Sequence, residues 1–224
     1  GNSAVNPIDI GEGGALFNFE SSPEITNSVF YDNGSAGGDG GAVFNKASTS
    51  SVVNTIFVGN SAGANGGAVV NTGATSPVIT NATLIANSAS GEGGAIYNGS
   101  DGSNPTVTNS ILWSNTAPTN PEVGNYSGFS DAEANPTFVH SLVQGSGGSG
   151  SWDTSFGTDG GGNIDANPQF FAPGDLDGPD NRFATPDDGL QVLSSSPAVD
   201  AGDDASLPTD VTDLDDDGDT SEAL

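Results

Sequence analysis

A motif of six residues recurs four times in the first half of the chain, and this repeat constrains the fold more than any other feature. The copies begin at Gly13, Gly40, Gly66 and Gly93, and each reads Gly-Gly-Ala, two apolar residues and Asn. Successive copies are 27, 26 and 27 residues apart. A fixed period of this length is the signature of a repeat architecture in which each unit stacks on the next.

Two further marks keep the same period. A β-branched block follows each copy of the motif and begins at Ile25, Val52, Ile79 and Val107, and an Asn closes each unit at Asn33, Asn60, Asn87 and Asn115. Short β-branched and aromatic runs alternate with Gly, Asn, Ser and Pro, which is typical of strands and tight turns. None of these runs has the period of a helix over several turns.

We therefore predict an all-β fold, a right-handed parallel β-helix (a single-stranded solenoid) whose coils have about 27 residues and two or three short strands each. The predicted domain spans residues 1–203, with regular coils over 11–115 and looser coils over 116–203. Residues 204–224 are expected to be an acidic, calcium-binding-like tail or linker. Within the looser part, we expect loops at 116–134 and 144–162 and strands of the last coils at 163–171 and 190–193.

Stacked coils place the same side chain above itself about 4.8 Å apart. Asn side chains stacked in this way can hydrogen-bond along the axis and satisfy backbone groups at the corners. The period predicts three such structural ladders, formed by Asn18, Asn45, Asn71 and Asn98; by Asn27, Asn54, Asn81 and Asn109; and by Asn33, Asn60, Asn87 and Asn115. The single histidine, His140, aligns with the second ladder, where a structural role is expected and a metal ligand or catalytic base is the alternative.

The charge of the chain restricts its partners. There are 29 acidic residues against 2 basic ones, for a net charge of -27. Nucleic acid is excluded because phosphate binding needs cationic neutralisation, and anionic membrane surfaces are excluded for the same reason. There is no Cys and no apolar run of transmembrane length, so neither disulfides nor a transmembrane segment is predicted.

The repeat also resembles a known family. The Gly-Gly-Ala-Ile/Leu/Val elements alternate with Phe30-Tyr31-Asp32-Asn33 and Phe57-Val58-Gly59-Asn60, and in the next two units Leu84 and Leu112 replace Phe. This alternation resembles the repeats of the polymorphic outer-membrane proteins, which are β-helical autotransported adhesins. The stretch from Asn163 to Asp203 is similar to the closing segment of many bacterial right-handed β-helix surface proteins. The resemblance implies a secreted, extracellular or cell-surface location of bacterial type.

Acidic residues gather in the last 50 residues, where there are 15 carboxylates. Residues 213–219 have carboxylates at alternate positions and a Gly for the turn, as at the start of an EF-hand loop, with Glu222 in place of the usual bidentate Glu. Residues 175–188 resemble an irregular calcium loop. We therefore predict calcium as cofactor, with candidate ligands Asp175, Asp177, Asp180, Asp187, Asp188, Asp213, Asp215, Asp217, Asp219 and Glu222. The alternative is a solvated acidic tail.

Catalysis is not predicted. Lyases that act on acidic polysaccharides need cations, and this chain offers Lys46 and Arg182 alone. Carboxylate pairs such as Asp203-Asp204, or Asp165 beside Asn163, permit a polysaccharide hydrolase as the alternative function. An ice-binding face would need a regular column of outward Thr residues. Val53 interrupts the column of Thr26, Thr80 and Thr108, so an ice-binding face is not predicted.

The expected function is that of a non-catalytic surface scaffold or adhesin, stabilised by calcium and self-assembling end to end through its coil edges into a homo-oligomer or filament. An adhesin of this kind would bind a glycan or a ligand on a host or neighbouring cell. Candidate contacts are the aromatic residues Tyr31, Trp113, Tyr126 and Trp152, and the alternative for each is packing in the core or a loop.

Overall fold

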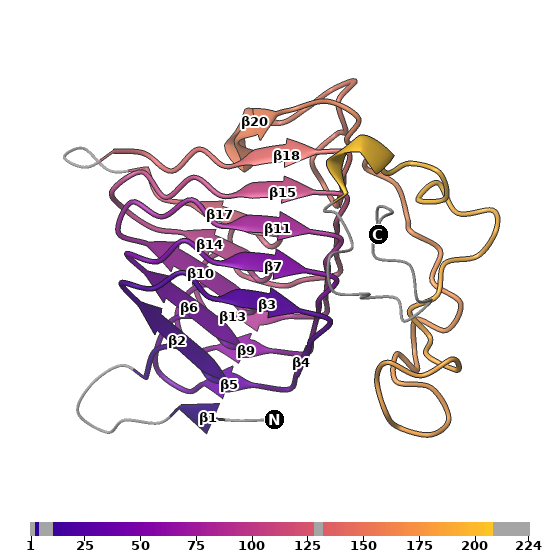
Figure 1. Cartoon of the computed structure of the whole chain (residues 1–224), viewed down its shortest axis with the longest axis horizontal. Coiled ribbons are helices and arrows are strands. Elements are labelled where there is room, and N and C mark those ends of the chain that lie inside the picture. Colours follow the sequence, from indigo (N-terminus) through magenta and orange to yellow (C-terminus); the bar gives the residue numbers. More distant parts are fainter. Residues whose placement is uncertain (1–2, 5–10, 128–131, 208–224) are drawn as a thin grey trace.

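The computed structural model describes residues 3–4, 11–127 and 132–207. The chain winds as stacked coils of short strands, and each coil crosses four parallel sheets, named A to D here (Figure 1). Sheet A contains β1 (Ser3–Ala4), β5 (Gly34–Ser35), β9 (Ser61–Ala62) and β13 (Ser88–Ala89). Sheet B contains β2 (Leu16–Phe19), β6 (Val43–Lys46), β10 (Val69–Thr72), β14 (Ile96–Asn98) and β17 (Val123–Asn125).

The other two sheets complete each coil. Sheet C contains β3 (Glu24–Thr26), β7 (Ser51–Val53), β11 (Val78–Thr80), β15 (Thr106–Thr108), β18 (Thr137–Val139) and β20 (Thr158–Asp159). Sheet D contains β4 (Val29–Tyr31), β8 (Ile56–Val58), β12 (Thr83–Ile85), β16 (Ile111–Trp113) and β19 (Leu142–Val143). The described residues also contain two short 3-10 helices, η1 (Thr154–Phe156) between β19 and β20, and η2 (Asp204–Ser206) after β20. The prediction of a parallel β-solenoid with coils of about 27 residues is confirmed.

The register of the sheets follows the repeat residue by residue. In sheet B, Val43 pairs with Val69 and Asn45 with Asn71, and in sheet D, Phe57 pairs with Leu84. Each coil has up to four strands where the sequence predicts two or three. The additional strand is the two-residue Gly-Ser or Ser-Ala piece of sheet A, whose residues carry no strand signal of their own.

One thin apolar core runs along the axis. It is built from the same column in each sheet: Val43, Val69, Ile96 and Val123 in sheet B; Ile25, Val52, Ile79, Val107 and Phe138 in sheet C; Phe57, Leu84, Leu112 and Val143 in sheet D. Each coil alone has too few apolar residues to bury, and stacking gives every interior residue an apolar neighbour above and below. Trp152 and Phe156 pack on the last part of this core, with Trp152 lying 5.7 Å from the ring of Phe138.

The two glycines of each Gly-Gly pair are required for different structural reasons. The first glycine of each pair has a left-handed backbone, with φ of +71° at Gly40 and +65° at Gly66. The second lies against the next coil: a Cβ on Gly41 would come within 2.1 Å of the carbonyl oxygen of Gly67. Only glycine fits both positions without strain or clash.

The stack of coils continues through both segments that were expected to be loops. Within 116–134, residues Val123–Asn125 form β17, which pairs with β14. Within 144–162, Thr158–Asp159 form β20, which pairs with β18. Both loop predictions are therefore corrected at these strands, although most of the remaining described residues there are turns and irregular backbone.

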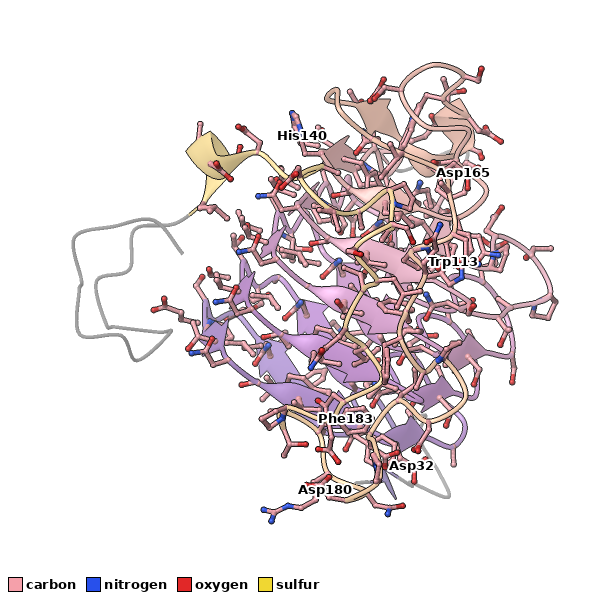
Figure 2. The ribbon with its side chains drawn as sticks, turned by 90° about the vertical axis from the view of Figure 1, so that its right-hand side faces the viewer. Asp32, Trp113, His140, Asp165, Asp180 and Phe183 are labelled. Carbon is pink, nitrogen blue, oxygen red and sulfur yellow. The ribbon has the colours of Figure 1, made fainter. Side chains whose placement is uncertain are left out.

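The chain changes its course after Ile164. The sequence predicts strands of the last coils at 163–171 and 190–193, and this is wrong: the pairing there is limited to a parallel bridge from Ile164 to Leu142 and an antiparallel bridge from Phe170 to Val192. Residues 167–207, called the C-terminal strap here, run back along the outside of sheet D (Figures 1 and 2).

The strap covers an apolar outer face. Phe170, Leu176, Phe183, Leu190 and Val192 pack with outward residues of sheet D, namely Ile56, Val58, Ile85 and Ile111. The ring of Phe183 lies 5.0 Å from that of Tyr31 in the first coils, and Figure 2 shows Phe183 and Asp180 near Asp32. Sheet D is thus apolar on both faces, and the strap removes its outer face from water.

Candidate functional site

The first predicted amide ladder is present and longer than predicted. The side-chain amide of Asn18 donates to Oδ1 of Asn45 at 2.8 Å, and the same bond recurs from Asn45 to Asn71 and from Asn71 to Asn98 at 2.9 and 3.0 Å. Asn98 continues it to Asn125 at 2.9 Å, and Asn125 donates to the carbonyl oxygen of Ser155. Asn125 was missed, although it lies 27 residues after Asn98.

The ladder of Asn33, Asn60, Asn87 and Asn115 is doubly bonded. Oδ1 of Asn87 accepts both the backbone N–H and the side-chain amide of Asn60, at 3.0 and 2.9 Å, and the same pair of bonds joins Asn87 to Asn115 at 2.9 Å each. The Asn87 amide also donates to the carbonyl oxygen of Phe57 at 3.0 Å. These side chains therefore satisfy corner backbone groups and connect coils at the same time.

A carboxylate that sequence reasoning missed ends the ladder of Asn33, Asn60, Asn87 and Asn115. Glu122 occupies the column of Ala42, Ala68 and Ala95, and its side chain is 1% exposed. Its two oxygens accept the backbone N–H of Asn115 at 3.1 Å and the side-chain amide at 2.5 Å. Burial raises the pKa of Glu122 from 4.5 to about 7, while the two hydrogen bonds from Asn115 lower it. The signal was available, because Glu stands where every earlier coil has Ala.

Backbone conformation accounts for the column of Asn27, Asn54, Asn81 and Asn109. Each residue has a left-handed backbone, with φ between +45° and +53°, and His140 continues the column at +46°. Asn tolerates this conformation better than most residues. The alignment of His140 with this column is confirmed, and its Nδ1 lies 3.2 Å from the carbonyl oxygen of Ala201.

The last members of this column hold the end of the strap. The Asn109 amide donates to the carbonyl oxygen of Asp203 at 3.1 Å, and its Oδ1 accepts the N–H of Asp203 at 2.9 Å. Asn109 and His140 also line a pocket of about 250 Å³ with Ala201 and Leu207. In Figure 2, His140 lies at the end of the molecule near η2. These contacts give His140 a structural setting against the strap.

The acidic residues at 175–188 form turns of the strap. Oδ2 of Asp187 accepts the N–H of Asp180 at 3.3 Å, and Oδ2 of Asp188 accepts the N–H of Ala184 at 2.8 Å. The hydroxyl of Thr185 donates to both Asp187 and Asp188, at 2.7 and 3.1 Å, and the bond to Asp187 lowers the pKa of that carboxyl.

Over the described ranges 11–127 and 132–207, no three acidic, His or Cys side chains gather closely enough to hold a metal ion. The candidate ligands Asp213, Asp215, Asp217, Asp219 and Glu222 lie outside the described residues. Calcium binding by the chain, at 175–188 as at 213–222, stays a prediction.

The four candidate aromatic contacts occupy different settings. Tyr31 contacts Phe183, Trp113 lines a pocket of about 510 Å³ with Phe170 of the strap, and Trp152 caps the core. These three therefore serve packing, at least in part. Tyr126 differs, because it lines a polar pocket of about 260 Å³ on the outside of the solenoid.

The carboxylates considered for hydrolysis are engaged locally. Both oxygens of Asp165 accept backbone N–H groups, from Gly145 and Gly147, at 3.0 Å each. Asp203 caps η2 and accepts the hydroxyl of Ser206 at 2.5 Å. Asn163 is buried and donates to the carbonyl oxygen of Phe138 at 2.8 Å. Thr80 and Thr108 of the Thr column are buried, at 6% and 7% exposure.

Comparison of the chain with protein-family models, with curated proteins and with solved structures finds no match. The class of protein therefore follows from the fold itself, which is a parallel β-solenoid of stacked repeats. Within the described residues, no helix is long and apolar enough to span a membrane.

Proposed function

We propose that this chain is a non-catalytic scaffold of the extracellular space or cell surface, which presents the sides of a rigid solenoid to a glycan or surface ligand. The observation that carries the proposal is the pair of continuous amide ladders, which tie the coils together side chain by side chain. Such networks stiffen a structure because every member is satisfied. A stiff body whose ladder side chains hydrogen-bond to one another is suited to presenting its side faces to a ligand.

The local engagement of the candidate catalytic acids supports the same proposal. Both oxygens of Asp165 already accept backbone hydrogen bonds from Gly145 and Gly147, which gives this carboxylate a structural role in that turn. The acidic surface, with a net charge of -27, supports a role in a saline medium, where the repulsion is screened. The family resemblance of the repeats supports the surface location.

The ends and the sides of the solenoid offer different binding opportunities. Trp152 and Phe156 pack over the core at one end, and we therefore place ligand binding on the sides. End-to-end assembly into filaments and stabilisation by calcium remain predictions. Electron microscopy with calcium and with a chelator tests both: filaments that dissolve on chelation would support them, and identical monomers in both conditions would refute them.

The test of the binding function is a glycan array probed with the full purified chain, together with incubation on neutral polysaccharides followed by assay of new reducing ends. The proposal expects glycan binding with no cleavage. Cleavage that disappears in an Asp165→Asn variant would instead establish the hydrolase. An array without any signal would remove glycan binding from the proposal.

A further inference from the structure

The outer face of sheet B differs from the other faces of the solenoid. Its two outward columns are Phe17, Phe44, Val70, Tyr97 and Gly124, and Phe19, Lys46, Thr72, Gly99 and Tyr126. The middle of the first column is buried, since Phe44 and Val70 are 3% and 1% exposed, so the accessible part of this face lies toward its two ends. Turn glycines lie against the first column: Gly40 approaches Phe44, and Gly66 approaches Val70. The second column has aromatic rings at its two ends, Phe19 and Tyr126. Between them lie the exposed Lys46 and the small residues Thr72 and Gly99.

A pocket lies at the Tyr126 end of this face. Its volume is about 260 Å³, and it is lined by Tyr126 with Asn120, Asn125, Glu133, Thr154 and Ser155. Three separate segments contribute: the flanks of β17, the residues before β18, and η1. The pocket thus combines an aromatic ring with two amides, a carboxylate and two hydroxyls.

The pocket is preformed by backbone hydrogen bonds. The N–H of Tyr126 donates to the carbonyl oxygen of Asn98 at 2.8 Å, and the carbonyl oxygen of Tyr126 accepts the N–H of Ala134 at 3.1 Å. The Asn125 amide, the end of the first ladder, donates to the carbonyl oxygen of Ser155 at 2.9 Å and so joins β17 to η1. A ligand meets walls that are already in place, which reduces the entropy lost on binding.

The surroundings of the pocket set the charge of its ligand. The Asn120 amide donates to Oε2 of Glu92 at 3.3 Å, and Glu133 lies in the wall. Burial, followed by the charges of Glu92 and Asp39, raises the pKa of the neighbouring Tyr97. The local field is therefore negative, and an anionic ligand would be repelled.

The chemistry of the lining matches one sugar ring. An aromatic face stacks on the C–H face of a pyranose, while hydroxyls and a carboxylate, here those of Thr154, Ser155 and Glu133, pair with its hydroxyl groups. We propose that the pocket around Tyr126 is a subsite for one uncharged or amino sugar of a bound glycan. This inference rests on the glycan-binding function proposed above.

The test uses the full chain on an array of neutral hexose, N-acetylhexosamine, amino-sugar, uronic-acid and sialylated oligosaccharides. We expect signals from the uncharged or amino sugars. Tyr126→Ala should weaken the strongest of these at least about tenfold, whereas Tyr126→Phe, which keeps the ring, should stay within about threefold. Tyr31→Ala is the matched control, because Tyr31 lies on sheet D and contacts the strap.

Glu133→Ala keeps the test valid if Tyr126→Ala does not fold, because Glu133 is exposed. This variant should weaken binding of the same sugar. Binding that is unchanged in both Tyr126→Ala and Glu133→Ala would overturn the subsite and leave the glycan-binding function standing. A preference for uronic or sialic acids would overturn the ligand class. An array with no signal would overturn the subsite and the glycan-binding function together.

Discussion

The stacked body, residues 11–164, and the C-terminal strap, residues 167–207, bury apolar residues of similar kinds by different means. In the body, each coil is bonded to the next by parallel ladders and amide side chains. In the strap, most hydrogen bonds join residues a few positions apart, and its long-range bonds include those from Asn109 and His140 to its end. The comparison teaches that composition alone does not set stability; the repetition of contacts does.

The difference has an energetic consequence. A residue in the body is supported by neighbours in the coils above and below, so losing it weakens a cooperative unit. A strap residue contacts one face of one sheet, so the strap can open locally while the body stays folded.

The largest expected loss of stability comes from a substitution in the doubly bonded ladder of Asn33, Asn60, Asn87 and Asn115. Asn87→Ala leaves the backbone N–H of Asn60 and one proton of its side-chain amide buried without their acceptor, because Oδ1 of Asn87 accepts both, while the amide keeps its bond to the carbonyl oxygen of Phe30. We expect a loss of about 4 kcal/mol in the free energy of unfolding. Urea titration followed by circular dichroism measures it. Asn167→Ala in the strap is the matched control and should cost no more than about 1 kcal/mol; equal losses would contradict the comparison.

The next effect compares two leucines. Leu84 is fully buried in the core of the body, and Leu190 is a strap residue that is partly buried against sheet D. Leu84→Ala should cost about 3 kcal/mol because of lost burial and the cavity left behind. Leu190→Ala should cost about 1 kcal/mol, since the strap can adjust. The same titration serves here, and a reversed order of the two losses would refute the assignment.

The buried Glu122 should make the stability of the body depend on pH. Its pKa is about 7 in the folded chain and near 4.5 when exposed, so the folded state keeps the proton to higher pH than the unfolded state. Stability from this group is therefore full below about pH 4.5 and is lost as the pH rises through 7, by about 3 kcal/mol in total. Below this window both states are protonated, and above it both are ionised.

Glu122→Gln isolates this contribution, because the repulsion among the other acids is common to both proteins. The difference in unfolding free energy between wild type and variant should change by about 2.5 kcal/mol between pH 5 and pH 8. Parallel curves over this range would show that Glu122 is not buried as described.

The smallest expected effect is at the far end of the strap. Phe183→Ala removes the ring contact with Tyr31. The global free energy of unfolding should fall by less than about 1 kcal/mol, while limited proteolysis near residues 178–190 should become faster. Unchanged proteolysis together with a large global loss would mean that the strap belongs to the cooperative unit.

Much of the body was predictable because its information is local and repeated. The positions of Asn18, Asn45 and Asn71 in one column follow directly from their spacing, as the hydrogen bonds confirm. β17 was missed because Asn120-Pro121-Glu122 replaces Gly93-Gly94-Ala95. The Asn98 to Asn125 spacing nevertheless kept the period, and the Glu in an Ala column marked an unusual buried group.

The strap was not predictable in the same way. Phe170 and Val192 have the composition of buried strand residues, and burial by stacking on a coil and burial by packing across a sheet leave the same local pattern. The outward apolar residues Val58, Ile85 and Trp113 gave a hint, because an exposed sheet face would be polar. The pocket at Tyr126 likewise joins three segments whose proximity depends on the coils between them.

Native-state hydrogen exchange tests the central comparison most directly. The account predicts that the amides of Asn60 and Asn87, which donate to the next ladder residue, exchange only through global unfolding. The amides of Phe171 and Leu193 in the strap should exchange at least about a hundredfold faster through local opening. Equal protection of the two groups, with the same dependence on denaturant, would contradict the account.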